Sequence, residues 1–289
     1  MNSSKRETKG ERDPLRFFSR PTLQSPALVV AWSEDAGRLG PRVNDYLRRK
    51  LGGHSFCEIE PVDFFPMGGV AIENDLAKFP ASWFYASPEH DLVLFESSPP
   101  DSDWYRFLNL VMDVAEHYCH VKEVHTVGGM VAISAHTTPR QLVAAFSSVE
   151  VKKSLSTYDL MTTFDYETAA TQRPTLSSYL LWVAKRRSVP AASLWVPVPF
   201  YLAGGEDLRA ERRVLQFIDQ RLELGIDFRD LDEGIKRQSE DLAEARVANA
   251  HIEGSIARLE SNQGLSEEES LRLVEEVDEF MKRKRERGA

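Results

Sequence analysis

Acidic side chains follow two apolar stretches of this sequence, where they could act together on a ligand. Glu34 and Asp35 come shortly after the apolar run at 27–32, and Glu96 comes directly after the run at 91–95. Two carboxylates that are held close together can share a proton or hold a cation. The alternative, which we favour, is that these residues lie in solvated loops and cap the helices that follow.

A pair of glycines and a histidine follow a third apolar stretch, at 121–127. The backbone N–H groups of Gly128 and Gly129 could form a cradle for an anion, because parallel α/β proteins bind ligands at strand ends. Glycine also permits a tight turn or close packing, and we favour that role. His136 could act as a general base at the mouth of the sheet. We favour a histidine that is hydrogen-bonded within its own turn.

A group of potential metal ligands lies between the second and third stretches. They are Glu116, His117, Cys119, His120, Glu123 and His125. A zinc site needs such side chains to converge on one point, but these residues straddle the end of a predicted helix and the start of a predicted strand. We therefore expect no metal site and no cofactor. The sequence also has no Walker A, GxGxxG, GxSxG or HExxH pattern, which argues against the commonest nucleotide-binding and hydrolase mechanisms.

The composition excludes some classes of protein. Thirty-six basic and 45 acidic residues give a net charge of −9, which disfavours a general nucleic-acid-binding protein because phosphate contacts need a cationic surface. Cys57 and Cys119 fit no disulfide framework, and we expect reduced thiols in a cytoplasmic protein. The first residues contain no apolar segment of the signal-peptide type, and no apolar run is long enough to span a membrane, so we expect no membrane association.

The apolar stretches predict the elements that would position the candidate residues. The runs at 27–32, 91–95 and 121–127 have the composition of buried strands, the last halting at the glycine pair. Periodic apolar residues predict helices at 38–51 and from about 101 to 118, so the second and third runs form a βαβ unit with parallel neighbours. A further apolar run at 191–201 contains Pro197 and Pro199, which exclude its end from the middle of a sheet ladder.

The C-terminal part differs in character, because charged, helix-favouring residues dominate after position 228. Apolar residues alternate at spacings of four and three from Leu231 to Leu259, which predicts one long heptad helix with polar interruptions at Gln238 and Asn249. A capping box at Ser266 and Glu269 begins a second helix that would pair with the first as a hairpin. The predicted partner-binding residues are Leu231, Ile235, Leu242, Ile252, Ile256 and Leu259.

Four blocks of the sequence occur in the same order as in a known family. They are SEDAG at 33–37, DLVLFESSPPDSDWYRF at 91–107, GGMVAISAHTTP at 128–139 and SLWVPVPFY at 193–201. Over roughly residues 26–227 this ordered set resembles the proteasome-assembly-chaperone-like family of bacteria and archaea. The resemblance implies an α/β sandwich similar to nucleoside phosphorylases and hydrogenase-maturation proteases, a tendency to form homo-oligomers, and no established catalytic activity. It also implies a strand at 142–146, although Thr138 and Gln141 have the spacing of a capping box.

The sequence departs from the family at three informative places. Family members carry a glycine-flanked Pro-Thr where this sequence has Gln172-Arg173-Pro174-Thr175-Leu176, which puts pocket chemistry that needs those glycines in doubt. Phe200 stands where family members carry a histidine, which puts pocket chemistry that needs that histidine in doubt. Archaeal members thought to dock on proteasome rings end in a hydrophobic residue, a tyrosine and one more residue. This sequence ends Arg287-Gly288-Ala289, so we expect no tail docking of that kind.

These features predict a flexible arm at 1–20, an α/β core at 21–227 with a mostly parallel central sheet in a three-layer sandwich, and a helical hairpin at 228–289. We expect a non-enzymatic homo-oligomer, with a trimer as one candidate, that binds another protein through its C-terminal helices and its oligomer surface. The alternative is a small-molecule hydrolase or phosphorylase that uses the strand-end loops. That alternative requires its candidate residues to converge on one concave pocket: Glu34, Asp35, Glu96, Gly128, Gly129 and His136.

Overall fold

The computed structural model describes the chain except residues 1–12, 66–70, 74, 163–168, 170–171 and 289. Most of the predicted flexible arm lies outside the described residues. No described helix is both long and apolar enough to cross a lipid bilayer.

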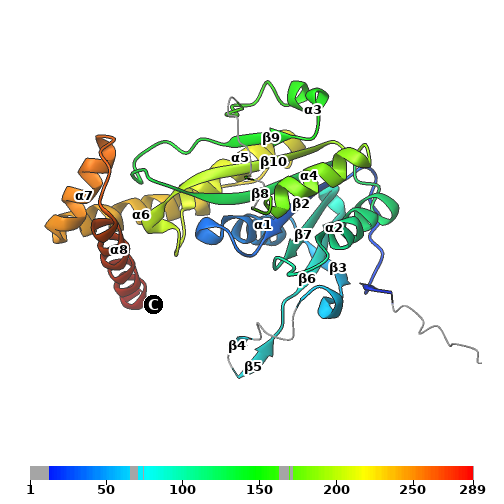
Figure 1. Cartoon of the computed structure of the whole chain (residues 1–289), viewed down its shortest axis with the longest axis horizontal. Coiled ribbons are helices and arrows are strands. Elements are labelled where there is room, and N and C mark those ends of the chain that lie inside the picture. The colour runs from blue at the N-terminus through cyan, green and yellow to red at the C-terminus, as the bar shows by residue number, and fades with distance from the viewer. Residues whose placement is uncertain (1–12, 66–70, 74, 163–168, 170–171, 289) are drawn as a thin grey trace, which may run out of the picture.

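An eight-stranded mixed sheet forms the middle layer, in the order β1-β3-β6-β7-β2-β8-β10-β9 (Figure 1). Its strands are β1 (Leu15–Phe17), β2 (Ala27–Trp32), β3 (His54–Ile59), β6 (Ser82–Ser87), β7 (Leu92–Ser97), β8 (Glu123–Ala132), β9 (Val143–Phe146) and β10 (Ala191–Pro199). Strands β7, β2, β8 and β10 are parallel, whereas the strands on both sides of them pair antiparallel. The sheet is therefore mixed and not mostly parallel. A separate hairpin of β4 (Ala71–Glu73) and β5 (Leu76–Lys78) projects from the body.

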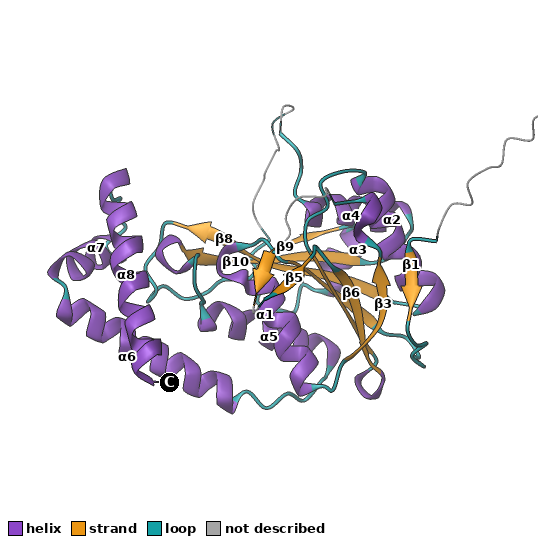
Figure 2. Ribbon diagram, turned by 90° about the horizontal axis from the view of Figure 1, so that it is seen from below, coloured by secondary structure: helices purple, strands orange, loops and turns teal. Residues whose placement is uncertain are grey.

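Helices cover both faces of the sheet. The described α-helices are α1 (Leu39–Lys50), α2 (Trp104–Asp113), α3 (Val149–Ser154), α4 (Leu176–Arg186), α5 (Leu208–Leu222), α6 (Arg229–Ala248), α7 (Ala250–Glu260) and α8 (Glu267–Gly288). One apolar core lies between the sheet and α1 with α5, and the other lies between the sheet and α2 with α4. Figure 2 shows these two pairs of helices on opposite sides of the strands. The predicted three-layer α/β sandwich is confirmed.

The buried strands form because both of their faces meet helices. Every residue of β2 is buried, which explains its continuous apolar sequence. Helix α1 places Leu39, Val43 and Leu47 on the face that meets the sheet, and its last turn carries three basic residues that suit the negative end of the helix dipole. These elements confirm the strand and helix predicted from the first apolar stretches.

Three predictions about the strands are corrected. Strand β8 does not halt at the glycines but continues through Gly128 and Gly129 to Ala132. Strands β7 and β8 are parallel but not adjacent, because β2 lies between them and pairs with both. Residues Leu15–Phe17, which were expected to belong to a flexible arm, pair with β3 as an edge strand.

Two predictions about the other side of the sheet are confirmed. Strand β9 spans Val143–Phe146, so the extended conformation prevails over the capping-box spacing. Strand β10 pairs with β9 only as far as Trp195, beyond which Pro197 and Pro199 have β8 alone as a neighbour. A proline that lacks its N–H is tolerated at such an edge.

The C-terminal helices form a three-helix unit, α6–α8, at one end of the molecule (Figure 2). The prediction of one continuous heptad helix is wrong. Helix α6 ends at Asn249, where the backbone is extended (φ −136°, ψ 111°). The Asn249 side chain then accepts the backbone N–H of His251 at 2.9 Å and caps α7. The chain therefore turns at Asn249, and the predicted two-helix hairpin becomes three helices.

The α6–α8 unit shares one apolar core with the α/β domain. Leu242, Ile256 and Leu273 are buried in the same cluster as Val198 and Tyr201 from the end of β10 and the turn after it. The apolar residues of the heptad pattern therefore make contacts within this chain.

Candidate functional site

The carboxylate of Asp35 joins two elements at the carboxyl ends of the parallel strands. Its Oδ2 atom accepts the backbone N–H of Gly40 at 2.8 Å and the backbone N–H of Gly129 at 3.0 Å. Gly40 lies in the first turn of α1, where a negative charge is favourable. Asp35 thus acts as a helix-capping acid, as favoured from the sequence, but it also ties α1 to β8.

The glycine pair in β8 serves close packing. A Cβ atom on Gly129 would lie 2.1 Å from the carbonyl oxygen of Ala36, and one on Gly128 would lie 3.1 Å from Asp35 Oδ2. Only glycine permits the turn after β2 to approach the strand this closely. The N–H group of Gly129 binds an anion as hypothesised, but this anion is the protein's own Asp35 carboxylate.

Asp35 carries an electrostatic cost in this position. Burial raises the pKa of its carboxyl to about 6, although the hydrogen bonds from Gly40 and Gly129 act in the opposite direction. Its second oxygen, Oδ1, is shielded from solvent and has no hydrogen-bond partner among the described residues. Carboxyl groups that are kept in such environments are more frequent at functional sites than elsewhere.

A cavity of about 260 Å³, here called the strand-end cavity, lies beside Asp35. Four predicted site residues line it: Glu34, Asp35, Gly128 and Gly129. The other principal parts of its lining were not predicted from the sequence: Trp32, Trp104, Trp195 and the first turn of α4. An apolar sequence context made these tryptophans look like core residues, and only their position at the ends of strands and at the start of a helix could have indicated the cavity.

Glu96 lies in a different place. It lines a cavity of about 540 Å³ beside α1, together with Arg38, Arg42 and Arg48. Burial raises the pKa of Glu96. The structure does not bring Glu96 into the strand-end cavity, so the predicted carboxylate pair with Glu34 and Asp35 is not assembled.

His136 belongs to a third environment. Its ring Nδ1 lies 2.9 Å from the hydroxyl oxygen of Tyr201, and its backbone N–H donates to that oxygen at 2.6 Å. Its partner is therefore a residue 65 positions away and not a group of its own turn. Burial lowers the pKa of His136 to about 4, which keeps the ring neutral near pH 7. It lies outside the strand-end cavity.

Two of the potential metal ligands between α2 and β8 are paired with arginines. Glu116 binds Arg187, and Glu123 binds Arg221 at 2.8 Å. Within the part of the chain that the structure describes, no group of three or more His, Cys, Asp or Glu side chains has an arrangement that could hold a metal ion.

The six residues predicted to bind a partner lie within the α6–α8 unit. Leu231, Leu242, Ile252, Ile256 and Leu259 are buried, and Ile235 is partly buried against the same core. These side chains make intramolecular contacts, so other residues form the outer surface of the helices.

The fold and the cavity define a three-layer α/β protein with a strand-end crevice and a C-terminal helical unit. Residues 30–246 match the PAC2 family, and the chain belongs to that family. This finding confirms the resemblance seen in the sequence blocks. No match is found among curated proteins.

Solved structures confirm the fold. A Corynebacterium glutamicum protein of unknown function is 18% identical with a TM-score of 0.71, over 86% of this chain and 96% of its own. Pyrococcus furiosus PbaB, an archaeal proteasome activator, is 20% identical with a TM-score of 0.65, over 80% and 97%. A Mycobacterium tuberculosis proteasome-assembly chaperone homologue is 18% identical with a TM-score of 0.63, over 75% and 94%. At these identities the similarity establishes the fold alone.

Proposed function

We propose that this protein is a non-enzymatic, assembly-chaperone-like protein that self-associates and binds another protein through its C-terminal helices. Membership of the PAC2 family supports this role, as do relatives described as an archaeal proteasome activator and a proteasome-assembly chaperone homologue. The proposal does not use the predicted catalytic residues, because Glu34 and Asp35, Glu96, and His136 lie in three separate environments.

The firm attachment of the α6–α8 unit to the α/β domain carries the proposal. Thr137, in the loop after β8, donates to Glu260 of α7 at 2.9 Å, and Arg246 of α6 bonds to the same carboxylate at 2.7 Å. Apolar residues of the unit are also part of the domain's core. A surface held in one orientation loses less conformational entropy when a partner binds, so these helices are suited to recognition.

The partner surface is assigned to the corner between α6 and α7. Val247 is 91% exposed there, and its neighbours Ala243, Ala248 and Ala250 are also exposed. The match to the family ends at residue 246, so Val247 and the residues after it lie outside the matched part. Partner selection by a surface that varies between relatives is expected when one fold serves several partners.

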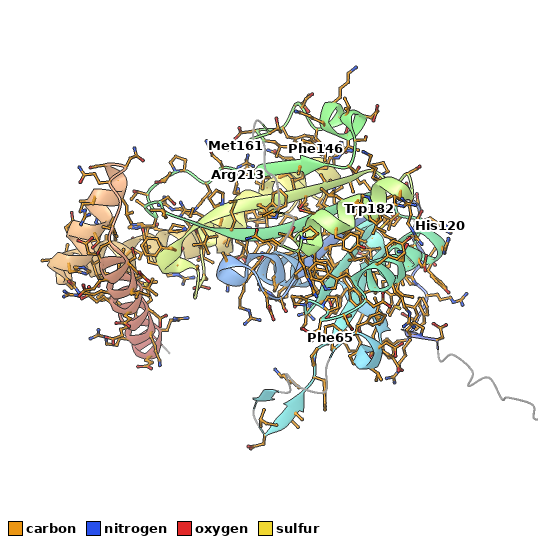
Figure 3. The ribbon with its side chains drawn as sticks, in the orientation of Figure 1. Phe65, His120, Phe146, Met161, Trp182 and Arg213 are labelled. Carbon is orange, nitrogen blue, oxygen red and sulfur yellow. The ribbon has the colours of Figure 1, made fainter. Side chains whose placement is uncertain are left out.

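The self-association surface is assigned to the outer side of α2 and α4. Tyr105 and Trp182 are 49% and 43% exposed there, with ring centroids 6.0 Å apart, and Figure 3 shows Trp182 on the outer layer of the molecule. The ring of Tyr179 packs beside that of Trp182, with the centroids 5.4 Å apart and the ring planes tilted by 44°. Tryptophan and tyrosine are enriched where protein surfaces meet, because they bury much apolar area at little cost in side-chain entropy.

Affinity purification of the full chain from its native lysate tests the partner surface. Deletion of residues 230–289 is unsuitable, since it would expose the core that the α6–α8 unit shares. We instead compare Val247→Glu with Val62→Glu, because Val62 is 78% exposed on the α/β domain. A partner lost from the first variant and retained by the second supports the proposal, whereas equal recovery from both contradicts it.

A further inference from the structure

The strand-end cavity occupies the position at which open α/β sheets bind ligands. It lies at the carboxyl end of β2, beside the turn that follows this strand. The glycine pair of β8 and Trp195 of β10, in the middle of the two longer neighbouring strands, line it as well. Crevices at such ends are the usual ligand sites of this fold class. The proposed protein-interaction surfaces do not involve this cavity, so its chemistry is a separate question.

Three indole rings give the cavity its apolar lining. Trp32 donates its indole N–H to Ser177 Oγ at 3.1 Å, and Trp104 donates its own to the carbonyl oxygen of Pro100 at 2.6 Å. These hydrogen bonds fix two of the rings and use their polar atoms. The parts of these two rings that remain for a ligand are their carbon atoms and π-electron faces, and cations are attracted to such faces. The Trp104 ring already has one cation near it, because the Arg173 guanidinium lies 5.8 Å from its centroid.

The charge that lines the cavity has one sign. Glu34 and Asp35 are acidic, and no described residue that lines the cavity is basic. Arg38 and Arg173 line two other cavities. The amino end of α4, at Thr175–Ser177, contributes a partial positive charge of about half a unit, which two carboxylates outweigh. The cavity is therefore an aromatic and acidic environment.

We propose that the strand-end cavity binds a small organic cation, an alkylammonium or quaternary ammonium group. The indole rings of Trp32, Trp104 and Trp195 would surround its alkyl groups, and Glu34 and Asp35 would supply the opposite charge. A cation in this position also offsets the cost of keeping Asp35 ionised in a buried site. The ammonium group has two potential sources, a free metabolite and the lysine side chain of a protein.

Calorimetric titration of the full chain tests this site with three probes. Choline represents a free quaternary ammonium compound, Nα-acetyl-lysine amide represents a protein side chain, and 3,3-dimethylbutanol is the uncharged isostere of choline. We expect at least one of the two cations to bind roughly tenfold more tightly than the isostere, with quenching of tryptophan fluorescence. The tighter of the two cations identifies the source. If neither cation binds, or if neither binds more tightly than the isostere, the proposal is overturned.

Variants show where the cation binds. Glu34→Gln removes one charge from an exposed side chain and should weaken binding about fivefold or more without affecting folding, which thermal unfolding would check. Trp195→Leu should weaken it further. Glu89→Gln, at an exposed carboxylate that does not line the cavity, is the matched control and should bind like the wild type. If Glu34→Gln and Glu89→Gln bind equally well, the site lies elsewhere and the proposal fails.

Discussion

The carboxylate of Asp35 accepts the backbone N–H of Gly129 at 3.0 Å, across 94 positions of sequence. This hydrogen bond connects the turn after β2 to the middle of β8, and the absence of a side chain at Gly129 makes the approach possible. The contact ties the first apolar stretch of the chain to the third, and it fixes one side of the strand-end cavity.

Substitution of Gly129 by alanine should be strongly destabilising. The new methyl group would lie 2.1 Å from the Ala36 carbonyl oxygen, so the turn would have to move away from β8. We expect a loss of roughly 1–3 kcal/mol or more in the free energy of unfolding, measured by urea denaturation. Gly254→Ala is the matched control, because nothing lies within 4 Å of its added methyl group and alanine favours the helix by about 1 kcal/mol. Similar losses in both variants would refute this explanation of the glycine pair.

Asp35 should make the stability of the protein depend on pH. Because burial raises the pKa of its carboxyl from 3.8 to about 6, the folded state holds this proton more tightly than the unfolded state. The contribution of Asp35 is therefore fully favourable below about pH 4 and is lost as the pH rises through 6. In Asp35→Asn this dependence disappears, so the stability difference between variant and wild type should shift by about 2–3 kcal/mol in favour of the variant between pH 4 and pH 7.

Urea unfolding of both proteins at several pH values measures this difference. Titrating groups common to the two proteins cancel in the comparison. A stability difference that stays constant between pH 4 and pH 7 would contradict a raised pKa at Asp35.

The ion pair between Arg140 and Asp207 should be important for stability. Arg140 Nε lies 2.7 Å from Asp207 Oδ2, both side chains are at most 4% exposed, and Asp207 also caps α5 through the N–H of Ala210. Arg140→Ala would leave a buried carboxylate without its partner, at a cost of roughly 3–5 kcal/mol. Arg229→Ala removes a pair with Asp227 that is fully exposed and should leave the thermal unfolding midpoint unchanged. Equal shifts in the two variants would show that the burial of the Arg140 pair has no effect.

Self-association should depend on the aromatic surface of α2 and α4. Trp182→Glu places a charge beside Tyr105 and Tyr179, and we expect a lower molar mass in size-exclusion chromatography with light scattering. Because Trp182 is half-exposed, the monomer should stay folded, which circular dichroism would verify. Val62→Glu should keep the wild-type mass. A folded Trp182→Glu variant with the wild-type mass, or a monomeric wild type, would rule out this surface.

The local elements were predictable because each depends on nearby residues. Strand β2 and helix α1 follow from an apolar run and a periodic stripe. The break at Asn249 was not predictable from spacing, since the alternation of apolar residues is the same for a straight helix and for two helices that turn inward. The extension of β8 through its glycines was also missed, because the partner that makes glycine necessary there is distant in sequence.

The candidate site was predictable only in part, for the same reason. Glu34 and Asp35 were identified with Gly128 and Gly129 because carboxyl ends of parallel strands lie at one edge. Glu96 also lies near the end of a strand, but its side chain lines the cavity beside α1, which Arg48 lines as well. His136 lies in a loop that is held by the hydroxyl group of Tyr201, and no local sequence pattern indicates the contact between these two residues.

The most direct test of the central claim is the amount of partner that copurifies with the full chain and with its Val247→Glu variant, measured by quantitative mass spectrometry of the same lysate. The account predicts that one or more proteins recovered with the wild type and with Val62→Glu are depleted about tenfold or more from Val247→Glu, since a buried charge at an interface costs over 1.4 kcal/mol. Undiminished recovery with a folded Val247→Glu variant would contradict a partner surface at the corner between α6 and α7.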